Sequence, residues 1–126
     1  MALAGFVGQE LTVLRRVPSD TSLEVSQWVE VLGECLADCP SIQGVSLASV
    51  VPALTPRVTQ ALAQLTHVPV LLVDANTPTG LSLDRYEGPT LGIDRVVDCV
   101  AALSLCPAPV AVFDMGTATT LSVVGN

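Results

Sequence analysis

The sequence predicts an α/β fold in which a mixed sheet is flanked by helices. Half of the 126 residues are apolar and 13% are charged, a balance typical of a globular domain with a buried core. Buried strands are expected over residues 43–51 and 67–74, with a helix over residues 54–66 between them. This strand–helix–strand order predicts a right-handed parallel crossover, and strand pairs elsewhere predict antiparallel neighbours.

The N-terminal part of the chain predicts a hairpin followed by a helix. Residues 2–17 contain two apolar runs around a Gly-Gln turn, a pattern typical of a β-hairpin. Apolar side chains recur at helical spacing within residues 19–39, and Thr21 with Glu24 forms a candidate capping box at the start. In the next helix, Thr55 is the predicted N-cap.

The C-terminal part predicts a loop, a helix and two strands. Residues 75–92 are rich in Pro, Gly and Thr and are expected to have little regular structure. A helix is predicted over residues 93–106. Residues 108–116 and 117–125 follow as two strands in close succession, which predicts an antiparallel pair.

Composition excludes several classes of function. The net charge of −7 argues against a nucleic-acid partner, which requires a basic face. The chain has no lysine, so a Walker-type phosphate loop is excluded. No apolar run reaches the roughly 18–20 residues of a membrane span, and the start lacks a signal-peptide pattern. The four cysteines fit buried thiols in a reducing compartment. We therefore expect a cytoplasmic protein with no membrane partner.

The first motif with chemical potential is the turn within "FDMGTATTLSVV", residues 113–124. Gly116 permits close approach of the backbone, and successive amide groups in such a turn can bind an anion. Asp114 could hold a cation beside phosphates, and the threonines add hydroxyl donors. The alternative is a plain hairpin that contains β-favouring threonines.

The second motif is "YEGPTLGIDR", residues 86–95. It places Asp94 and Arg95 where a loop opens a helix. One interpretation makes Asp94 a general base toward a hydroxyl group, with Arg95 binding a substrate carboxylate through two hydrogen bonds. In the alternative interpretation, Asp94 caps the helix and Arg95 is solvated.

Together with "ASVVPALT" upstream, these two motifs closely resemble the type III pantothenate kinase family. This family, also known as the Bvg accessory factor family, belongs to the superfamily of acetate and sugar kinases, Hsp70 and actin. The resemblance covers essentially all 126 residues. It implies a ribonuclease H-like (actin-like ATPase) domain that phosphorylates pantothenate with ATP, the first step of coenzyme A biosynthesis.

The resemblance also implies roles for individual residues. Asp94 would be the proton acceptor that activates the pantothenate hydroxyl group. Asp114 would bind a monovalent cation, potassium or ammonium, and magnesium would accompany ATP. Gly116 and Thr117 would contact ATP. The residues implied to contact pantothenate are Tyr86, Gly92, Ile93, Asp94 and Arg95.

The chain differs from the family pattern at its ends. The family opens with a strand and a D-x-G-N-T phosphate loop, whereas Met1 here enters at the hairpin. We therefore expect a single incomplete domain over residues 1–126, the N-terminal half of a kinase that is a homodimer when intact and inactive as this piece. The alternatives are a non-catalytic relic that binds a ligand or partner, and a different kinase of the superfamily.

Overall fold

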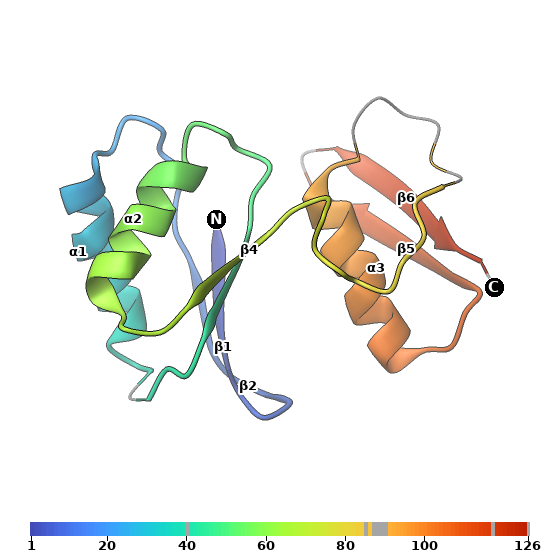
Figure 1. The fold of residues 1–126 in the computed structure, drawn as a ribbon, viewed down its shortest axis with the longest axis horizontal. Helices are drawn as coiled ribbons and strands as arrows, with labels where there is room; N and C mark the ends of the chain where they lie inside the picture. Colours follow the sequence, from blue (N-terminus) through green and yellow to red (C-terminus); the bar gives the residue numbers. More distant parts are fainter. Residues whose placement is uncertain (40, 85, 87–90, 117, 126) are drawn as a thin grey trace. The chain divides into compact units, whose positions relative to one another are not determined.

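The computed structural model describes residues 1–39, 41–84, 86, 91–116 and 118–125 (Figure 1). The chain forms two compact units, Met1–Leu72 and Val73–Asn126. Helices and strands occur in both units, so the predicted mixed α/β class is confirmed. In the described part of the chain the strands form three two-stranded sheets, whereas the sequence predicted one mixed sheet.

The first unit contains two helices, three complete strands and most of a fourth strand, whose last residue belongs to the second unit. In chain order they are β1 (Ala2–Val7), β2 (Glu10–Arg16), α1 (Val25–Leu36), β3 (Val45–Ala48), α2 (Thr55–Leu65) and β4 (Val70–Val73). Strands β1 and β2 form the predicted antiparallel hairpin, with an irregularity of register between Gly5 and Phe6. A Cβ atom on Gly5 would lie 3.2 Å from both Cys39 Sγ and Val13 Cβ, so a side chain at this position would crowd its neighbours.

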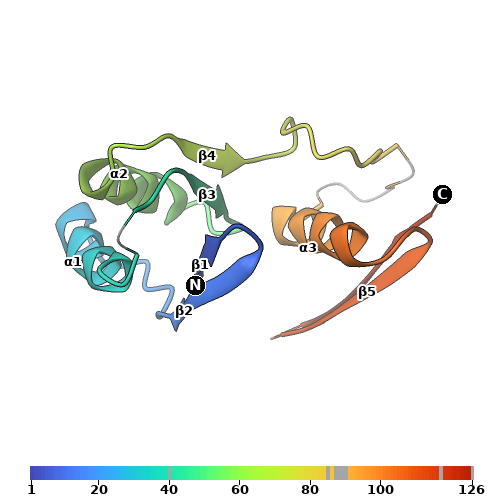
Figure 2. The same ribbon diagram turned by 90° about the horizontal axis from the view of Figure 1, so that it is seen from below.

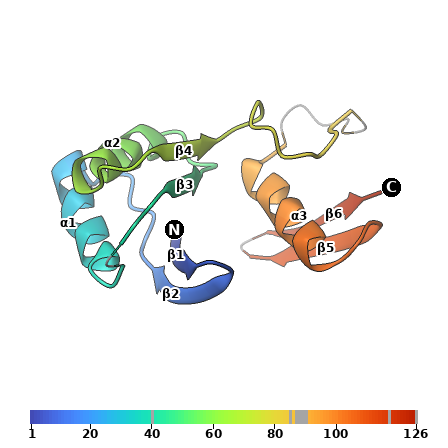
Figure 3. The same cartoon turned by 60° about the horizontal axis from the view of Figure 1, so that its bottom comes forward.

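Strands β3 and β4 are hydrogen-bonded neighbours joined through helix α2. The Val45 amide donates to the Pro69 carbonyl at 3.2 Å. Figures 2 and 3 show both strands running in the same direction, as the strand–helix–strand pattern predicted.

The core of the first unit lies between α1 and α2. Their apolar stripes meet in a cluster of buried side chains, namely Trp28, Leu32, Leu54, Val58, Ala61 and Leu62. Trp28 and Leu32 are the largest fully buried side chains in the described part of the chain. The helical periodicity of residues 19–39 therefore marks a packing face.

Both helices of this unit begin at residues other than those predicted. The N-cap of α1 is Glu24, which forms a capping box with Gln27 in place of the predicted Thr21–Glu24 pair. The main reason is a contact from α2, because Arg57 Nη1 donates to the carbonyl groups of Thr21 and Leu23, at 2.6 and 3.2 Å, and holds these residues outside the helix.

The N-cap of α2 is Leu54 rather than Thr55. The Thr55 amide already donates to the Val51 carbonyl at 3.2 Å. Its hydroxyl group donates to Ser49 Oγ at 2.8 Å. Thr55 thus lies inside the first turn, and its hydroxyl group ties the helix to the segment before it.

The second unit consists of a loop, helix α3 (Ile93–Leu105) and strands β5 (Val110–Met115) and β6 (Thr119–Val124). The described residues between 75 and 92 contain no helix or strand, as predicted. Strands β5 and β6 are antiparallel, and Asp114 is the register partner of Thr120. Figure 2 shows α3 lying along one face of this hairpin.

Alternation along the strands divides the β5–β6 hairpin into two faces. The face toward α3 carries the polar groups of Asp114, Thr120 and Ser122. The opposite face, here called the outer face, carries Phe113, Met115, Leu121 and Val123, which are 66%, 81%, 50% and 69% exposed. In the described residues, no helix is both long enough and apolar enough to cross a membrane.

Candidate functional site

All the described residues that the two motifs nominate lie in the second unit. Gly92 is the N-cap of α3 and has an extended backbone conformation. Its carbonyl group accepts a hydrogen bond from the Arg95 amide at 3.1 Å. Helix α3 therefore begins directly at the Gly92–Arg95 segment, and Asp94 and Arg95 project from its first turn.

Asp94 is an exposed carboxylate at the N-terminus of α3. Its Oδ1 atom accepts a hydrogen bond from the Arg95 amide at 2.9 Å. The Arg95 amide is thus shared between the Gly92 carbonyl group and the Asp94 carboxylate, and the helix dipole there favours a negative charge. The capping role is thus observed, and among the described residues nothing donates to Oδ2. The carboxylate keeps one oxygen with which to accept a proton.

Arg95 joins the two motifs. Its Nε atom donates to Ser122 Oγ at 3.0 Å. Its Nη2 atom donates to the Leu121 carbonyl at 2.9 Å. The guanidinium group therefore holds the first turn of α3 against β6, and the interpretation of Arg95 as a merely solvated residue is wrong.

Asp114 and Gly116 lie where β5 ends. The Asp114 carboxylate faces the α3 side of the hairpin, and a Cβ atom built on Gly116 would lie 3.8 Å from Asp114 Oδ1 and 3.9 Å from the Ala118 carbonyl oxygen. The polar atoms nearest to this position are therefore a carboxylate oxygen and a carbonyl oxygen. In the described part of the chain, no three His, Cys, Asp or Glu side chains are grouped to hold a metal ion.

Two nominated residues are less fully defined. Thr117 lies outside the described residues. Tyr86 is 38% exposed, and its amide donates to the Leu83 carbonyl at 2.9 Å.

A third carboxylate, which the motifs did not nominate, belongs to this region. Asp98 lies one helical turn after Asp94 and is half-buried. Burial raises the pKa of its carboxyl group, and the negative charges of Asp114 and Asp94 raise it further. Asp98 therefore lies within electrostatic range of both nominated carboxylates, Asp94 and Asp114.

Replacing Asp98 by Asn is expected to stabilise the second unit at neutral pH. Because the pKa of Asp98 is raised above the ordinary value of 3.8 for an aspartate, the folded state binds more protons than the unfolded state between the two pKa values. The stability that Asp98 contributes is thus complete below pH 3.8 and is lost as the pH rises through the raised value. Urea unfolding measured from pH 3.5 to 7 should show a steeper decline for the unmodified chain than for Asp98→Asn. Parallel curves would contradict this expectation.

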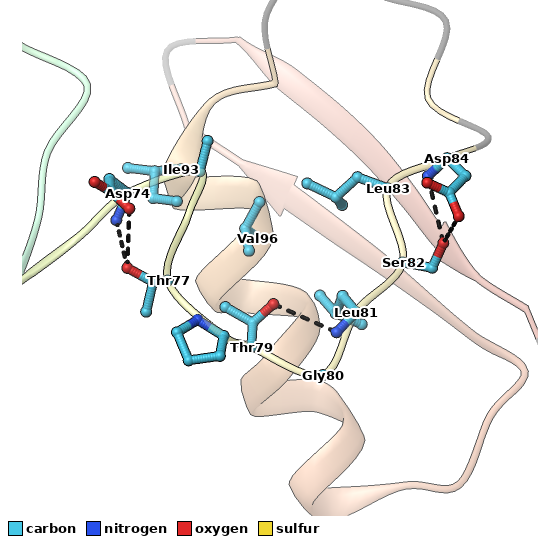
Figure 4. Close-up of a pocket in the computed structure, with 12 residues that line it drawn as sticks. Asp74, Thr77, Thr79, Gly80, Leu81, Ser82, Leu83, Asp84, Ile93 and Val96 are labelled. Carbon is cyan, nitrogen blue, oxygen red and sulfur yellow. Dashed lines mark hydrogen bonds between the residues drawn. The ribbon is translucent and has the colours of Figure 1, made fainter.

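An open cavity of about 390 Å³ adjoins the start of α3 (Figure 4). It is lined by the loop from Asp74 to Asp84 together with Ile93 and Val96. The loop is held in shape by its own side chains, because Thr77 Oγ1 donates to Asp74 Oδ1 at 3.2 Å and Ser82 Oγ donates to Asp84 Oδ2 at 2.7 Å. A nominated substrate contact, Ile93, therefore lies on a cavity wall.

The sequence motifs did not nominate Asp98, Ser122 or the loop residues that line the cavity as parts of a site. Helical spacing could have indicated Asp98, because it lies four residues after Asp94. Strand alternation could have indicated Ser122, which shares a face with Asp114. In the loop, the sequence offered no signal beyond its content of turn-forming residues.

Comparison with known proteins identifies the class to which this arrangement belongs. A family model described as "Type III pantothenate kinase" matches residues 1–126, and the relatives carry the same name. The class of protein is therefore a family of kinases. The chain belongs to the type III pantothenate kinase family.

Three relatives illustrate the extent of the similarity. The type III pantothenate kinase of Moorella thermoacetica is 38% identical over 132 residues, covering 100% of this chain and 51% of the relative. That of Roseiflexus castenholzii is 30% identical, covering 97% of this chain and 49% of the relative. That of Shouchella clausii is 37% identical over 83 residues, covering 66% of this chain and 32% of the relative. The chain thus spans about half the length, or less, of the relatives it matches.

Proposed function

We propose that this chain carries the substrate-activating part of an enzyme that transfers the γ-phosphoryl group of ATP to the hydroxyl group of pantothenate. The observation that carries the proposal is the pair of hydrogen bonds from Arg95 to β6. They hold the start of α3 against β6, the strand that follows the turn of the first motif, and this supports treating the two motifs as one site. In the sequence these motifs are about twenty residues apart.

Each side chain has a role that suits phosphoryl transfer. Such a reaction depends mainly on positioning and on electrostatic stabilisation, because the transferred group needs little covalent help from the protein. Asp94 accepts the proton of the attacking hydroxyl group through its unpartnered oxygen. Arg95 supplies a fixed positive charge for the carboxylate of pantothenate. The cavity beside Ile93 is of a size that small-molecule sites commonly have, which supports placing part of pantothenate there.

The turn at Gly116 completes the proposal on the nucleotide side. Gly116 and Thr117 contact ATP, which binds with magnesium, and Asp114 holds potassium or ammonium with the Ala118 carbonyl group. The cation supplies positive charge near the phosphates. The proposal also includes the ribonuclease H-like (actin-like) fold, a homodimer of full-length chains and a cytoplasmic location.

Replacing Gly116 by Ala tests the nucleotide side with little risk to the fold. The nearest atoms to the added Cβ would be 3.8 and 3.9 Å away, an ordinary contact distance, and Gly116 is not among the glycines with positive φ. The fold should therefore tolerate the methyl group, whereas a phosphate approaching the backbone should not. We expect KM for ATP to rise about tenfold or more, the loss of one to two charge-assisted hydrogen bonds.

The assay follows ATP-dependent formation of phosphopantothenate by mass spectrometry, in a chain extended to the length of its relatives. Gly44→Ala is the matched control, because nothing lies within 4 Å of the added Cβ there and Gly44 belongs to neither motif. No phosphopantothenate from the unmodified protein would overturn the proposed function. An unchanged KM for ATP in Gly116→Ala would remove Gly116 from the nucleotide site.

A further inference from the structure

Among the described residues, the Arg95 guanidinium donates hydrogen bonds from one of its two edges, the edge of Nε and Nη2. Its Nε–H and one N–H of Nη2 point to the same side, and β6 occupies this side with Ser122 Oγ and the Leu121 carbonyl oxygen. The other edge is formed by Nη1 and the second N–H of Nη2 and lies at the tip of the side chain. In the described part of the chain, Nη1 donates no hydrogen bond.

Strand β6 provides these two acceptors in different ways. The Leu121 carbonyl group is fixed by the antiparallel pairing of Leu121 with Phe113 and needs no particular side chain. The second acceptor exists only because residue 122 carries a hydroxyl group on the face toward α3. Ser122 is half-buried, whereas its neighbours Leu121 and Val123 belong to the outer face.

The charges around Arg95 explain why this support matters. Asp94 precedes Arg95, Asp98 follows on the same helix, and Asp114 faces α3 from β5. Despite these carboxylates, no ion pair joins Arg95 to an acidic side chain in the described residues, because the guanidinium is held against β6 instead. A long arginine side chain without this support would be free to turn toward a carboxylate of its own protein and lose its open edge.

We infer that Ser122 is a positioning residue that keeps the open edge of Arg95 directed at a carboxylate of the substrate. This inference rests on the proposed function, in which Arg95 binds the carboxylate of pantothenate. The open edge offers two parallel N–H donors, which match the two oxygens of a carboxylate in a bidentate pair. Ser122 therefore acts on substrate affinity through Arg95 and has no part in proton transfer.

The test compares Ser122→Ala with Ser122→Thr in a chain extended to the length of its relatives. Loss of one hydrogen bond to a charged group is expected to raise KM for pantothenate about tenfold in Ser122→Ala. KM for ATP and kcat should stay within about twofold, since the change removes one neutral hydroxyl group and no charge. Ser122→Thr keeps the hydroxyl group and suits a strand, so it should restore the affinity for pantothenate.

A neutral substrate separates positioning from a general structural effect. The alcohol analogue, in which CH₂OH replaces the carboxylate of pantothenate, has no charge for Arg95 to bind. Its KM should be the same for Ser122→Ala and the unmodified enzyme. If Ser122→Ala raises KM by the same factor for pantothenate and for the alcohol, the role of Ser122 is merely structural and the inference is overturned. An unchanged KM for pantothenate would also overturn the inference.

A second measurement uses the 126-residue chain itself. The Nε–H signal of Arg95 in nitrogen–proton NMR spectra should exchange slowly with water and become fast in Ser122→Ala. Arg57 is the internal control, because its Nη1 atom donates to the carbonyl groups of Thr21 and Leu23, which Ser122→Ala leaves unchanged. Equal exchange at Arg95 in both proteins would overturn the inference.

If the unmodified full-length enzyme forms no phosphopantothenate, the proposed function fails; if it does and Ser122→Ala is indistinguishable from it, only the inference fails.

Discussion

Replacing Asp94 by Asn is expected to lower kcat for pantothenate phosphorylation by about 10²–10⁴-fold, the usual contribution of a positioned general base. Asparagine has nearly the same size and its Oδ1 atom can still accept the Arg95 amide, a contact of 2.9 Å in the unmodified chain. It cannot take the proton of the attacking hydroxyl group. Folding and the affinity for pantothenate should therefore stay within a few fold.

The measurement pairs a coupled turnover assay with calorimetric titration of pantothenate, on a chain extended to the length of its relatives. Asp38→Asn is the matched control, since Asp38 is an exposed carboxylate paired with Arg15, and surface pairs of this kind contribute little. If Asp94→Asn turns over at the rate of the control, Asp94 is a helix cap and another group accepts the proton.

Replacing Leu32 by Ala is expected to destabilise the first unit by about 2–5 kcal/mol. Leu32 is 1% exposed and lies in the cluster between α1 and α2, so the truncation removes buried methyl groups and leaves a cavity. Fluorescence of Trp28 can follow urea unfolding of this unit, because Trp28 is the single tryptophan of the chain and belongs to the same cluster.

Leu105→Ala provides the same chemical change at an exposed position. Leu105 is 84% exposed at the end of α3, and its truncation should alter stability by no more than about 0.5 kcal/mol. A similar midpoint for both variants would show that the α1–α2 cluster does not stabilise the first unit.

The sequence predicted the order and type of the elements well because each depends on local periodicity. The hairpins, the three helices and the antiparallel β5–β6 pair all lie within a few residues of their predicted bounds. Helix α1 begins later than predicted for a non-local reason. Thr21 and Glu24 have the spacing of a capping box, but Arg57 of α2 holds the Thr21 carbonyl from 36 residues away.

The candidate site was predicted residue by residue but not as an assembly. The motifs nominated Asp94, Arg95 and Asp114. The side-chain contact that joins α3 to the hairpin is the hydrogen bond from Arg95 to Ser122, and a serine in a strand sequence gives no sign of such a contact. Asp98 was missed because its significance depends on the packing of α3 against β5: burial raises the pKa of its carboxyl group, and the nearby charge of Asp114 raises it further. Local sequence patterns contain neither contact.

The outer face of the β5–β6 hairpin bears on the interpretation of stability measurements on the 126-residue chain. Phe113, Met115, Leu121 and Val123 present adjoining apolar surface to water, and such a surface favours burial against a second molecule. Association of folded chains through this face would stabilise them by mass action, and melting temperatures and urea midpoints would then depend on the protein concentration. Differences between variants therefore have thermodynamic meaning only within a dilution series, where the value extrapolated to the most dilute samples belongs to the single chain.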